Sequence, residues 1–216
     1  MKKIFKAFYY LFVPGALERT MRYHFHKQQE LKNVATTLGL DDSVHLANLA
    51  QFMTICSLDI IQLNRHILFA WPSWTKKLHS RHLMLAIHEL ADDMSHLLGK
   101  SLREIIARGP TPNKYLEQLD QCRNSLALLL RNYRQHILNV MTISAAHRDH
   151  DATLLLKTID SINVPNTRDL AIKMQEWCSL TIRFLNAVTT DYNKRKIEEL
   201  AKAMKSLRRY AASADG

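Results

Sequence analysis

A long apolar stripe between residues 116 and 151 constrains the fold of this chain more than any other feature. Its members recur at helical spacing and nearly keep a seven-residue repeat, which is typical of a helix that contacts partners along most of its length. They are Leu119, Cys122, Leu126, Leu129 or Leu130, Tyr133, Ile137, Val140, Ser144 and His147. The stripe predicts a helix from about Pro112 to Ala146. His147 then falls where a core residue is expected, so we expect its ring to be buried and hydrogen-bonded.

Glycine and proline are scarce, with five residues of each. Because β-structure needs turn residues at short intervals, this scarcity favours long helices joined by few loops. The breaks that do occur predict further helices over residues 1–14, 17–37, 43–70, 75–108, 154–162 and 166–210. Asp41, Asp42 and Ser43 offer N-caps for the third helix, and Asn166 or Thr167 for the last. The expected fold is therefore an all-α, up-and-down bundle of about six to seven helices.

The length of 216 residues predicts a single helical domain over residues 1–216, with room for a real core. Within it, residues 1–14 are interpreted as a helix docked on the bundle, with contact to a membrane surface as the lesser alternative. Residues 211–216 are small and polar and are expected to form a disordered tail. No stretch approaches the roughly 20 apolar residues of a membrane-spanning helix, so no transmembrane segment is expected.

The few cysteines and tryptophans bear on the compartment of the protein and on its core. The three cysteines lie far apart and form no C-x-x-C pair, which predicts reduced core thiols in a cytoplasmic protein. They are Cys56, Cys122 and Cys178. Trp71 and Trp74 flank Pro72 and could stack on nucleic-acid bases. The more common arrangement, which we expect here, has both tryptophans covering the end of the core.

The net charge of +10 favours attraction to nucleic acid, anionic membranes or acidic proteins. The basic residues concentrate near the C-terminus, where only Glu198 and Glu199 offset them. They are Lys194, Arg195, Lys196, Lys202, Lys205, Arg208 and Arg209, and the apolar face between them is Ile197, Leu200, Ala201, Met204 and Leu207. This pattern predicts a basic amphipathic helix that binds RNA or DNA, a membrane or an acidic protein partner. A bundle helix with a solvated exterior would show the same pattern.

Two short motifs suggest a family. Arg131 and His136 form an Arg-x4-His motif, and residues 145–149 read Ala-Ala-His-Arg-Asp around His147. In a basic helical chain these segments resemble the HEPN superfamily and its relatives among abortive-infection factors. The resemblance implies a metal-independent ribonuclease. In it, His136 or His147 would act as general acid or base on a ribose 2′-hydroxyl, and Arg131 would hold the phosphate.

Helix geometry sets a condition on that activity. Five residues on a helix turn about 500°, so Arg131 and His136 point about 140° apart. Arg131 then lies opposite the apolar stripe and is expected to face solvent, while His136 lies near the edge of the stripe. We therefore expect no contact between them within one chain, and catalysis would require a homodimer or a break in the helix.

A second candidate site follows from the row His88, Asp92 and His96. Their four-residue spacing suggests one helical face, and two histidines with a carboxylate suit zinc or another transition metal. The first and third positions are about 12 Å apart, so further ligands would have to come from another helix, such as His147, His150 or Asp151. A polar seam between helices is the favoured interpretation, and no metal or other cofactor is expected.

The chain has no glycine-rich phosphate loop, nucleophile elbow or paired-cysteine knuckle. These absences argue against nucleotide-driven, acyl-transfer and zinc-finger functions. We expect a non-enzymatic, HEPN-like bundle of a prokaryotic cytoplasm that binds nucleic acid or a protein partner. The alternatives are a dimeric, metal-independent HEPN ribonuclease and, third, a metal-dependent hydrolase.

Overall fold

The computed structural model describes residues 2–146 and 152–214, with side chains from residue 15 to 139, at 153, 156 and 157, and from 159 to 207. This part of the chain contains helices and no strand, which confirms the predicted all-α bundle. The helices are α1 (Lys2–Thr37), α2 (Asp41–Phe69), α3 (Ser73–Leu97), α4 (Lys100–Ala107), α5 (Pro112–Ala146), α6 (Ala152–Asp160) and α7 (Val164–Ala214).

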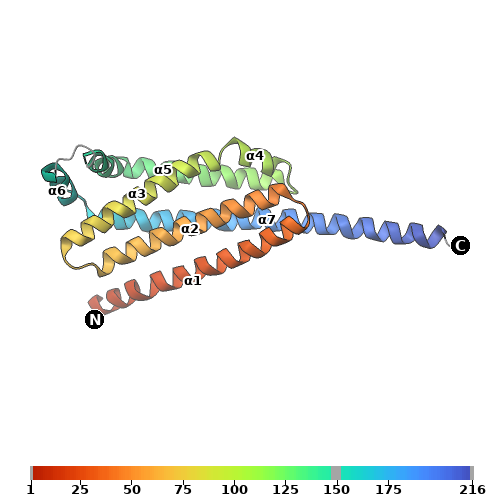
Figure 1. The fold of residues 1–216 in the computed structure, drawn as a ribbon, viewed down its shortest axis with the longest axis horizontal. Helices are drawn as coiled ribbons and strands as arrows, with labels where there is room; N and C mark the ends of the chain where they lie inside the picture. Colours follow the sequence, from red (N-terminus) through yellow and green to blue (C-terminus); the bar gives the residue numbers. More distant parts are fainter. Residues whose placement is uncertain (1, 147–151, 215–216) are drawn as a thin grey trace.

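The long helices of the described chain, α1, α2, α3, α5 and α7, run along a common axis, whereas α4 and α6 are short and lie at opposite ends (Figure 1). α2 packs against α1, α3 and α7, and α7 also packs against α3 and α5. α2 and α7 therefore form the centre of the bundle. Beyond the level of the turn between α1 and α2, α7 continues alone and leaves the body of the molecule (Figure 1).

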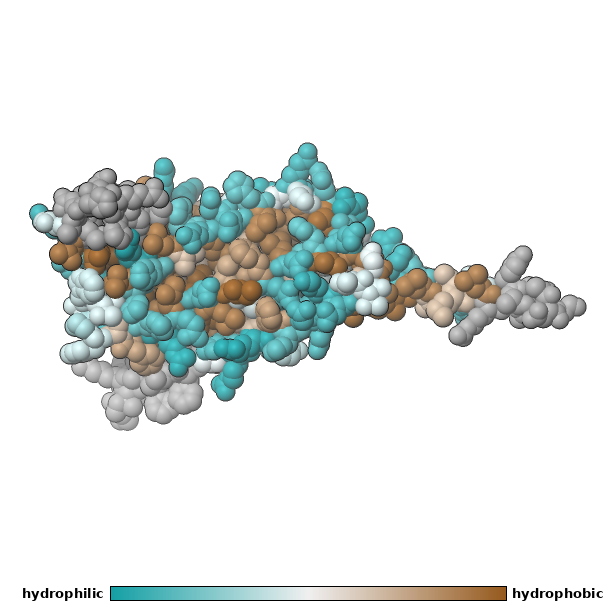
Figure 2. Space-filling model, viewed as in Figure 1, coloured by the Kyte–Doolittle hydropathy of each residue, from teal (hydrophilic) through white to brown (hydrophobic). Residues whose placement is uncertain are grey.

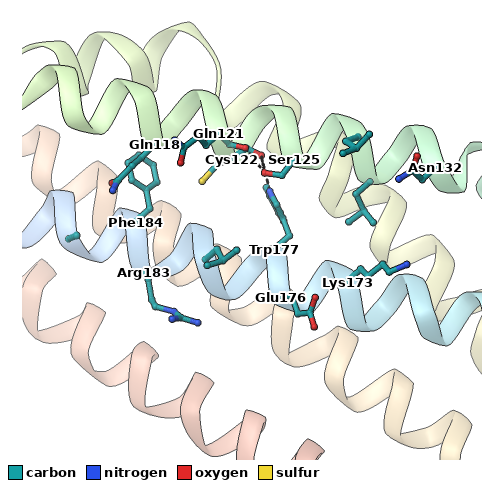
Figure 3. Close-up of a pocket in the computed structure, with 14 residues that line it drawn as sticks. Gln118, Gln121, Cys122, Ser125, Asn132, Lys173, Glu176, Trp177, Arg183 and Phe184 are labelled. Atoms are coloured by element: carbon teal, nitrogen blue, oxygen red, sulfur yellow. Dashed lines mark hydrogen bonds between the residues drawn. The ribbon is translucent and has the colours of Figure 1, made fainter.

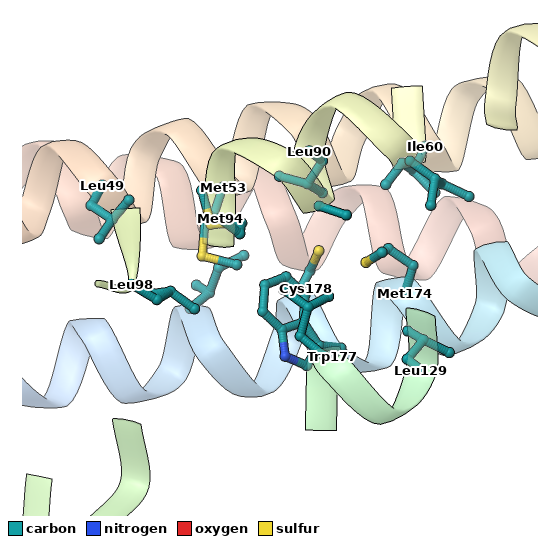
Figure 4. Close-up of a cluster of buried hydrophobic side chains, with 14 of the residues drawn as sticks. Leu49, Met53, Ile60, Leu90, Met94, Leu98, Leu129, Met174, Trp177 and Cys178 are labelled. Carbon is teal, nitrogen blue, oxygen red and sulfur yellow. The ribbon is translucent and has the colours of Figure 1, made fainter. Parts of the chain in front are cut away.

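The interior is built from leucine, isoleucine and methionine side chains with Trp177 and Cys178 among them (Figure 4). Met53 of α2, Met94 of α3 and Met174 of α7 are all fully buried. Burial of such a side chain contributes about 1.5–3 kcal/mol each. The predicted stripe of α5 is part of this core, since Leu119, Leu126 and Leu129 are buried.

α1 differs from the prediction because it continues through Pro14 and Gly15 as one helix. A proline inside a helix removes one backbone hydrogen bond and costs roughly 3 kcal/mol, which made residue 14 a plausible helix end. α1 instead packs along α2, and tertiary contacts outweigh the local preference. The expected separate helix 1–14 is therefore the first part of α1.

The predicted helix 75–108 is interrupted at Gly99, where α3 ends and α4 begins. The Gly99 amide donates to the carbonyl of His96 at 3.0 Å. A Cβ atom at Gly99 would lie 2.6 Å from that carbonyl oxygen, so only glycine fits this close approach. The glycine in the sequence marked the break that the apolar periodicity concealed.

The last helix begins earlier than predicted. The side chain of Asn163, rather than Asn166 or Thr167, caps it by accepting the Asn166 amide at 3.0 Å. Pro165 then falls in the first turn, where its missing N–H is not needed. At the other end, α7 reaches Ala214, so residues 211–214 of the expected tail are helical.

The two tryptophans between α2 and α3 correct another prediction. Trp71 is 91% exposed and Trp74 is 44% exposed, so they do not cover the end of the core. The segment from Ala70 to Pro72 that joins the two helices is too short to fold back over the bundle. Both rings therefore face water.

Among the described helices, α2 alone is long and apolar enough to cross a membrane, by length and composition. Just over half of its most apolar stretch, 56%, is buried inside the protein. The central position of α2 explains this burial, because a core helix passes the same test as a membrane span.

Candidate functional site

His136 of α5 is tied to the beginning of α7. Its Nε2 atom lies 2.9 Å from Oγ1 of Thr167. The Thr167 hydroxyl donates to the Asn163 carbonyl at 3.1 Å, so it has only lone pairs left for the histidine, and Nε2–H must be the donor. Burial lowers the pKa of His136, which favours the neutral ring. This arrangement joins two helices and leaves Nε2 engaged in a structural bond.

Arg131 is exposed, and no hydrogen bond joins it to His136. This confirms the geometric expectation that the two side chains do not meet within one chain. His147, the alternative histidine, lies outside the described residues, as do His150 and Asp151. The structure therefore assembles no acid–base pair from the described members of the HEPN-like motifs.

The histidine row on α3 divides between two clefts. His88 and Asp92 line a cleft against α5, where Arg134 lines the opposite wall. His96 lines a different groove against α2, together with His45 and Asp93. The expectation of one shared face was wrong because each four-residue step turns about 400°, so eight residues drift by about 80°. Among the described residues, no group of three or more His, Cys, Asp or Glu side chains could hold a metal ion.

A polar cluster that the sequence did not reveal joins α5 to α7. Tyr133 donates a hydrogen bond to Asp169, and Lys173 donates to both, at 2.7 Å to the Tyr133 hydroxyl and 2.9 Å to the Asp169 carboxylate. The Tyr133 and Lys173 hydrogen bonds hold the pKa of Asp169 below its usual range. Burial and the bond to Asp169 raise the pKa of Tyr133. All three groups are satisfied by one another, which indicates a structural role.

An open groove of about 660 Å³ lies between α5 and α7 (Figure 3). Trp177 forms part of its floor and donates from Nε1 to the Cys122 carbonyl at 2.9 Å. Leu128 and Leu180 are 53% and 60% exposed beside it. Burial raises the pKa of the Cys122 thiol, which keeps it protonated and unreactive. The groove thus offers apolar contact but no activated nucleophile.

The C-terminal part of α7 contrasts with these sites because it has no packing partner. From Lys194 to Leu207 every residue is exposed except Lys196, which is half-buried. We call residues 194–207 the projecting segment. Apolar side chains are visible along it in the space-filling view (Figure 2). Arg208 and Arg209 belong to the same helix, but their side chains lie outside the described part.

The first three basic residues of the projecting segment form ion pairs within the segment. Arg195 contacts Glu199 at 2.9 Å, Lys196 contacts the same carboxylate at 3.7 Å, and Lys194 contacts Glu198 at 4.0 Å. No described acidic side chain forms an ion pair with Lys202 or Lys205. Exposed pairs of this kind contribute little to stability, so they leave the segment a solvated, basic helix.

Comparisons with known proteins do not choose among these sites. No protein-family model, curated protein or solved structure matches the chain. The resemblance to the HEPN superfamily therefore stays a prediction that depends on residues 131–136 and 145–149. The function has to be inferred from the exposed surfaces of the chain itself.

Proposed function

We propose that this protein is a non-enzymatic, HEPN-like binding protein that uses the projecting segment of α7 to hold a helical protein partner. One observation supports this most directly. The apolar side chains of Ile197, Leu200, Met204 and Leu207 are 51%, 41%, 57% and 68% exposed on the projecting segment, against which no other described helix packs. Large apolar side chains that follow a pattern on the surface mark interaction sites.

The spacing of these four residues defines the partner. They alternate by three, four and three positions, which are the a and d positions of a seven-residue repeat. A seam this narrow fits the side of another helix, whereas helices that lie on membranes have a broader apolar face. Ala201 and Ala203 flank the seam and allow a second helix to approach closely.

The charges beside the seam further restrict which partner helix can bind. Lys196 lies directly before Ile197 on one side of the seam, and Arg208 lies directly after Leu207 on the other side. Such flanking positions select partners through opposite charge. We therefore expect an apolar seam bordered by glutamate or aspartate in the partner helix.

Nucleic acid is the second candidate, and a separate observation favours it. Lys202 and Lys205 point away from the seam and have no ion-pair partner among the described residues. Arg195 and Arg209 occupy the same outward register in the sequence. A row of cations on one side of a helix can follow a phosphate backbone, and the binding would then fall steeply with salt.

Two four-residue variants separate these candidates. The seam variant replaces Ile197, Leu200, Met204 and Leu207 with serine. The charge variant replaces Arg195, Lys202, Lys205 and Arg209, which share the outward register, with glutamate. Its control carries the same charge change at exposed residues of the body, namely Lys27, Lys100, Lys114 and Arg123.

The probes are a synthetic acidic heptad peptide, single-stranded RNA and duplex DNA. We expect the wild type to bind the peptide and the seam variant to lose that binding, while the control retains it. Nucleic-acid binding that is lost in the charge variant alone would replace the protein partner with RNA or DNA. A homodimer that dissociates in the seam variant would identify a second copy as the partner. No binding and no dimer would reject the proposal.

A further inference from the structure

The end of the bundle opposite the projecting segment exposes three large aromatic residues within six positions of the sequence. Phe69 is 56% exposed, Trp71 is 91% exposed and Trp74 is 44% exposed. They surround the connection between α2 and α3. Aromatic side chains carry large apolar areas, so a group of them in water is unfavourable unless another surface covers it.

Two segments without acidic residues meet at this end. Residues 1–17 and residues 60–88 contain no aspartate or glutamate. α1 begins near the point where α2 ends, because the two helices are antiparallel (Figure 1). The first segment contributes Lys2, Lys3 and Lys6 to the sequence at this end.

The described charges at this end are partly compensated from outside the two segments. Arg65 lies 3.5 Å from Glu18, and Lys77 lies 2.8 Å from Asp160. Lys76 forms no ion pair with a described acidic residue. The sequence at this end therefore carries an excess of positive charge, in addition to the exposed aromatic rings.

We propose that this end of the bundle docks on the surface of a membrane that contains anionic lipid. Trp71 and Trp74 would lie at the level of the headgroups, where tryptophan is enriched because one part of its ring is apolar and its N–H is polar. Described basic residues at this end, such as Lys76, would contact the lipid phosphates, each contributing about 1 kcal/mol. α2 would not cross the membrane, because its apolar residues are largely used in the core.

The sequence at the beginning of α1 favours a membrane over nucleic acid. Residues 4–13 read Ile-Phe-Lys-Ala-Phe-Tyr-Tyr-Leu-Phe-Val, which is aromatic and aliphatic with a single charge. Aromatic rings can stack on bases, but a run of aliphatic and aromatic residues has no counterpart on a sugar–phosphate backbone. A lipid surface accommodates both kinds of side chain.

The test uses the full chain with two kinds of vesicle, phosphatidylcholine alone and phosphatidylcholine mixed with phosphatidylglycerol. We expect the protein to sediment with the mixed vesicles, less with the neutral ones, and less again as salt is added. The variant Trp71→Ala/Trp74→Ala should bind the mixed vesicles at least about tenfold more weakly, equivalent to about 1.4 kcal/mol. The matched control Leu128→Ala/Leu180→Ala removes exposed leucines from the side of the bundle and should bind as the wild type does.

Fluorescence gives a second readout that does not depend on a disruptive substitution. Trp71 and Trp74 are exposed and Trp177 is buried, so a blue shift on addition of mixed vesicles reports the two exposed rings. Circular dichroism checks that each variant is folded. Failure to bind mixed vesicles, or equal loss in the leucine control, would reject the proposal. RNA binding that depends on Trp71 and Trp74, without vesicle binding, would replace it with base stacking.

Discussion

The two ends of this bundle expose apolar side chains in different ways. At the end with Trp71 the exposed residues are aromatic and lie on a short connection between helices. On the projecting segment they are aliphatic, and a regular helix places them in one narrow seam. A cluster on a turn can press into a surface without directional preference, whereas a seam requires another helix in register. The comparison teaches that the geometry of exposed apolar residues, more than their number, indicates the kind of partner.

Removing residues 197–216 is the change with the largest expected effect. The shortened chain should lose all binding to the acidic heptad peptide, because the seam is gone. Its thermal midpoint should stay within a few degrees of the wild type, since residues 197–207 are exposed and bury nothing. Vesicle binding should also be unchanged, because it belongs to the other end. Differential scanning calorimetry and vesicle sedimentation check both points, and a large drop in the thermal midpoint would mean that the segment packs on the body.

Asn193 marks the boundary between the buried and the projecting parts of α7. It is 4% exposed, donates to the Leu31 carbonyl at 3.1 Å and accepts from the Ser43 hydroxyl at 2.7 Å. Asn193→Ala should lower the free energy of unfolding by about 1–3 kcal/mol, because it leaves buried polar groups unpaired.

The matched control for Asn193 is Leu200→Ala, two helical turns further along. Leu200 is exposed, so its substitution should change the free energy of unfolding by less than about 0.5 kcal/mol. Urea denaturation measures both variants. Equal effects at the two positions would contradict the boundary between the body and the projecting segment.

Lowering the pH should have a smaller effect on the free energy of unfolding, and this effect arises from histidines in the body of the bundle. Burial lowers the pKa of His136, so the unfolded chain binds a proton more readily than the folded one. The free energy of unfolding should therefore fall as the pH drops through about 6.5, and level off once the folded state is protonated too. His24 and His82, whose pKa values burial also lowers, act in the same direction.

His136→Gln tests the share of this one histidine. The glutamine amide can still donate to Thr167 but does not titrate, so the variant should lose less stability than the wild type between about pH 7.5 and 5.5. Denaturant titrations at several pH values measure the difference, and identical acid sensitivity would contradict it. Cleavage of single-stranded RNA in EDTA by the wild type, lost in this variant, would instead support the ribonuclease alternative.

The periodicity of apolar residues predicted the long helices well and the connections between them poorly. α5 begins at Pro112, where the sequence predicted, and it is helical as far as residue 146, after which residues 147–151 are not described. Pro14 was mistaken for a helix end because local preference does not include the support that α2 gives to α1. Trp71 was assigned to the core because hydrophobicity alone does not show whether a short connection can fold back.

The same limit applies to the candidate sites, because the periodicity of one helix does not predict its contacts with another. Helical phase correctly predicted that Arg131 faces solvent. The bond between His136 and Thr167 depends on how the end of α5 meets the beginning of α7, which no local pattern encodes. The separation of His96 from His88 could have been predicted, since it follows from the drift of about 80° over eight residues.

The continuity of α7 has a mechanical consequence. It is one helix from Val164 to Ala214, about 75 Å long at 1.5 Å per residue. The Asn193 hydrogen bonds hold it where it leaves the body, and nothing in its sequence beyond that point, neither glycine nor proline, provides a hinge before Gly216. A partner bound to the projecting segment is therefore connected to the core through one stiff helix. The direction of the bound segment then fixes the orientation of the whole molecule.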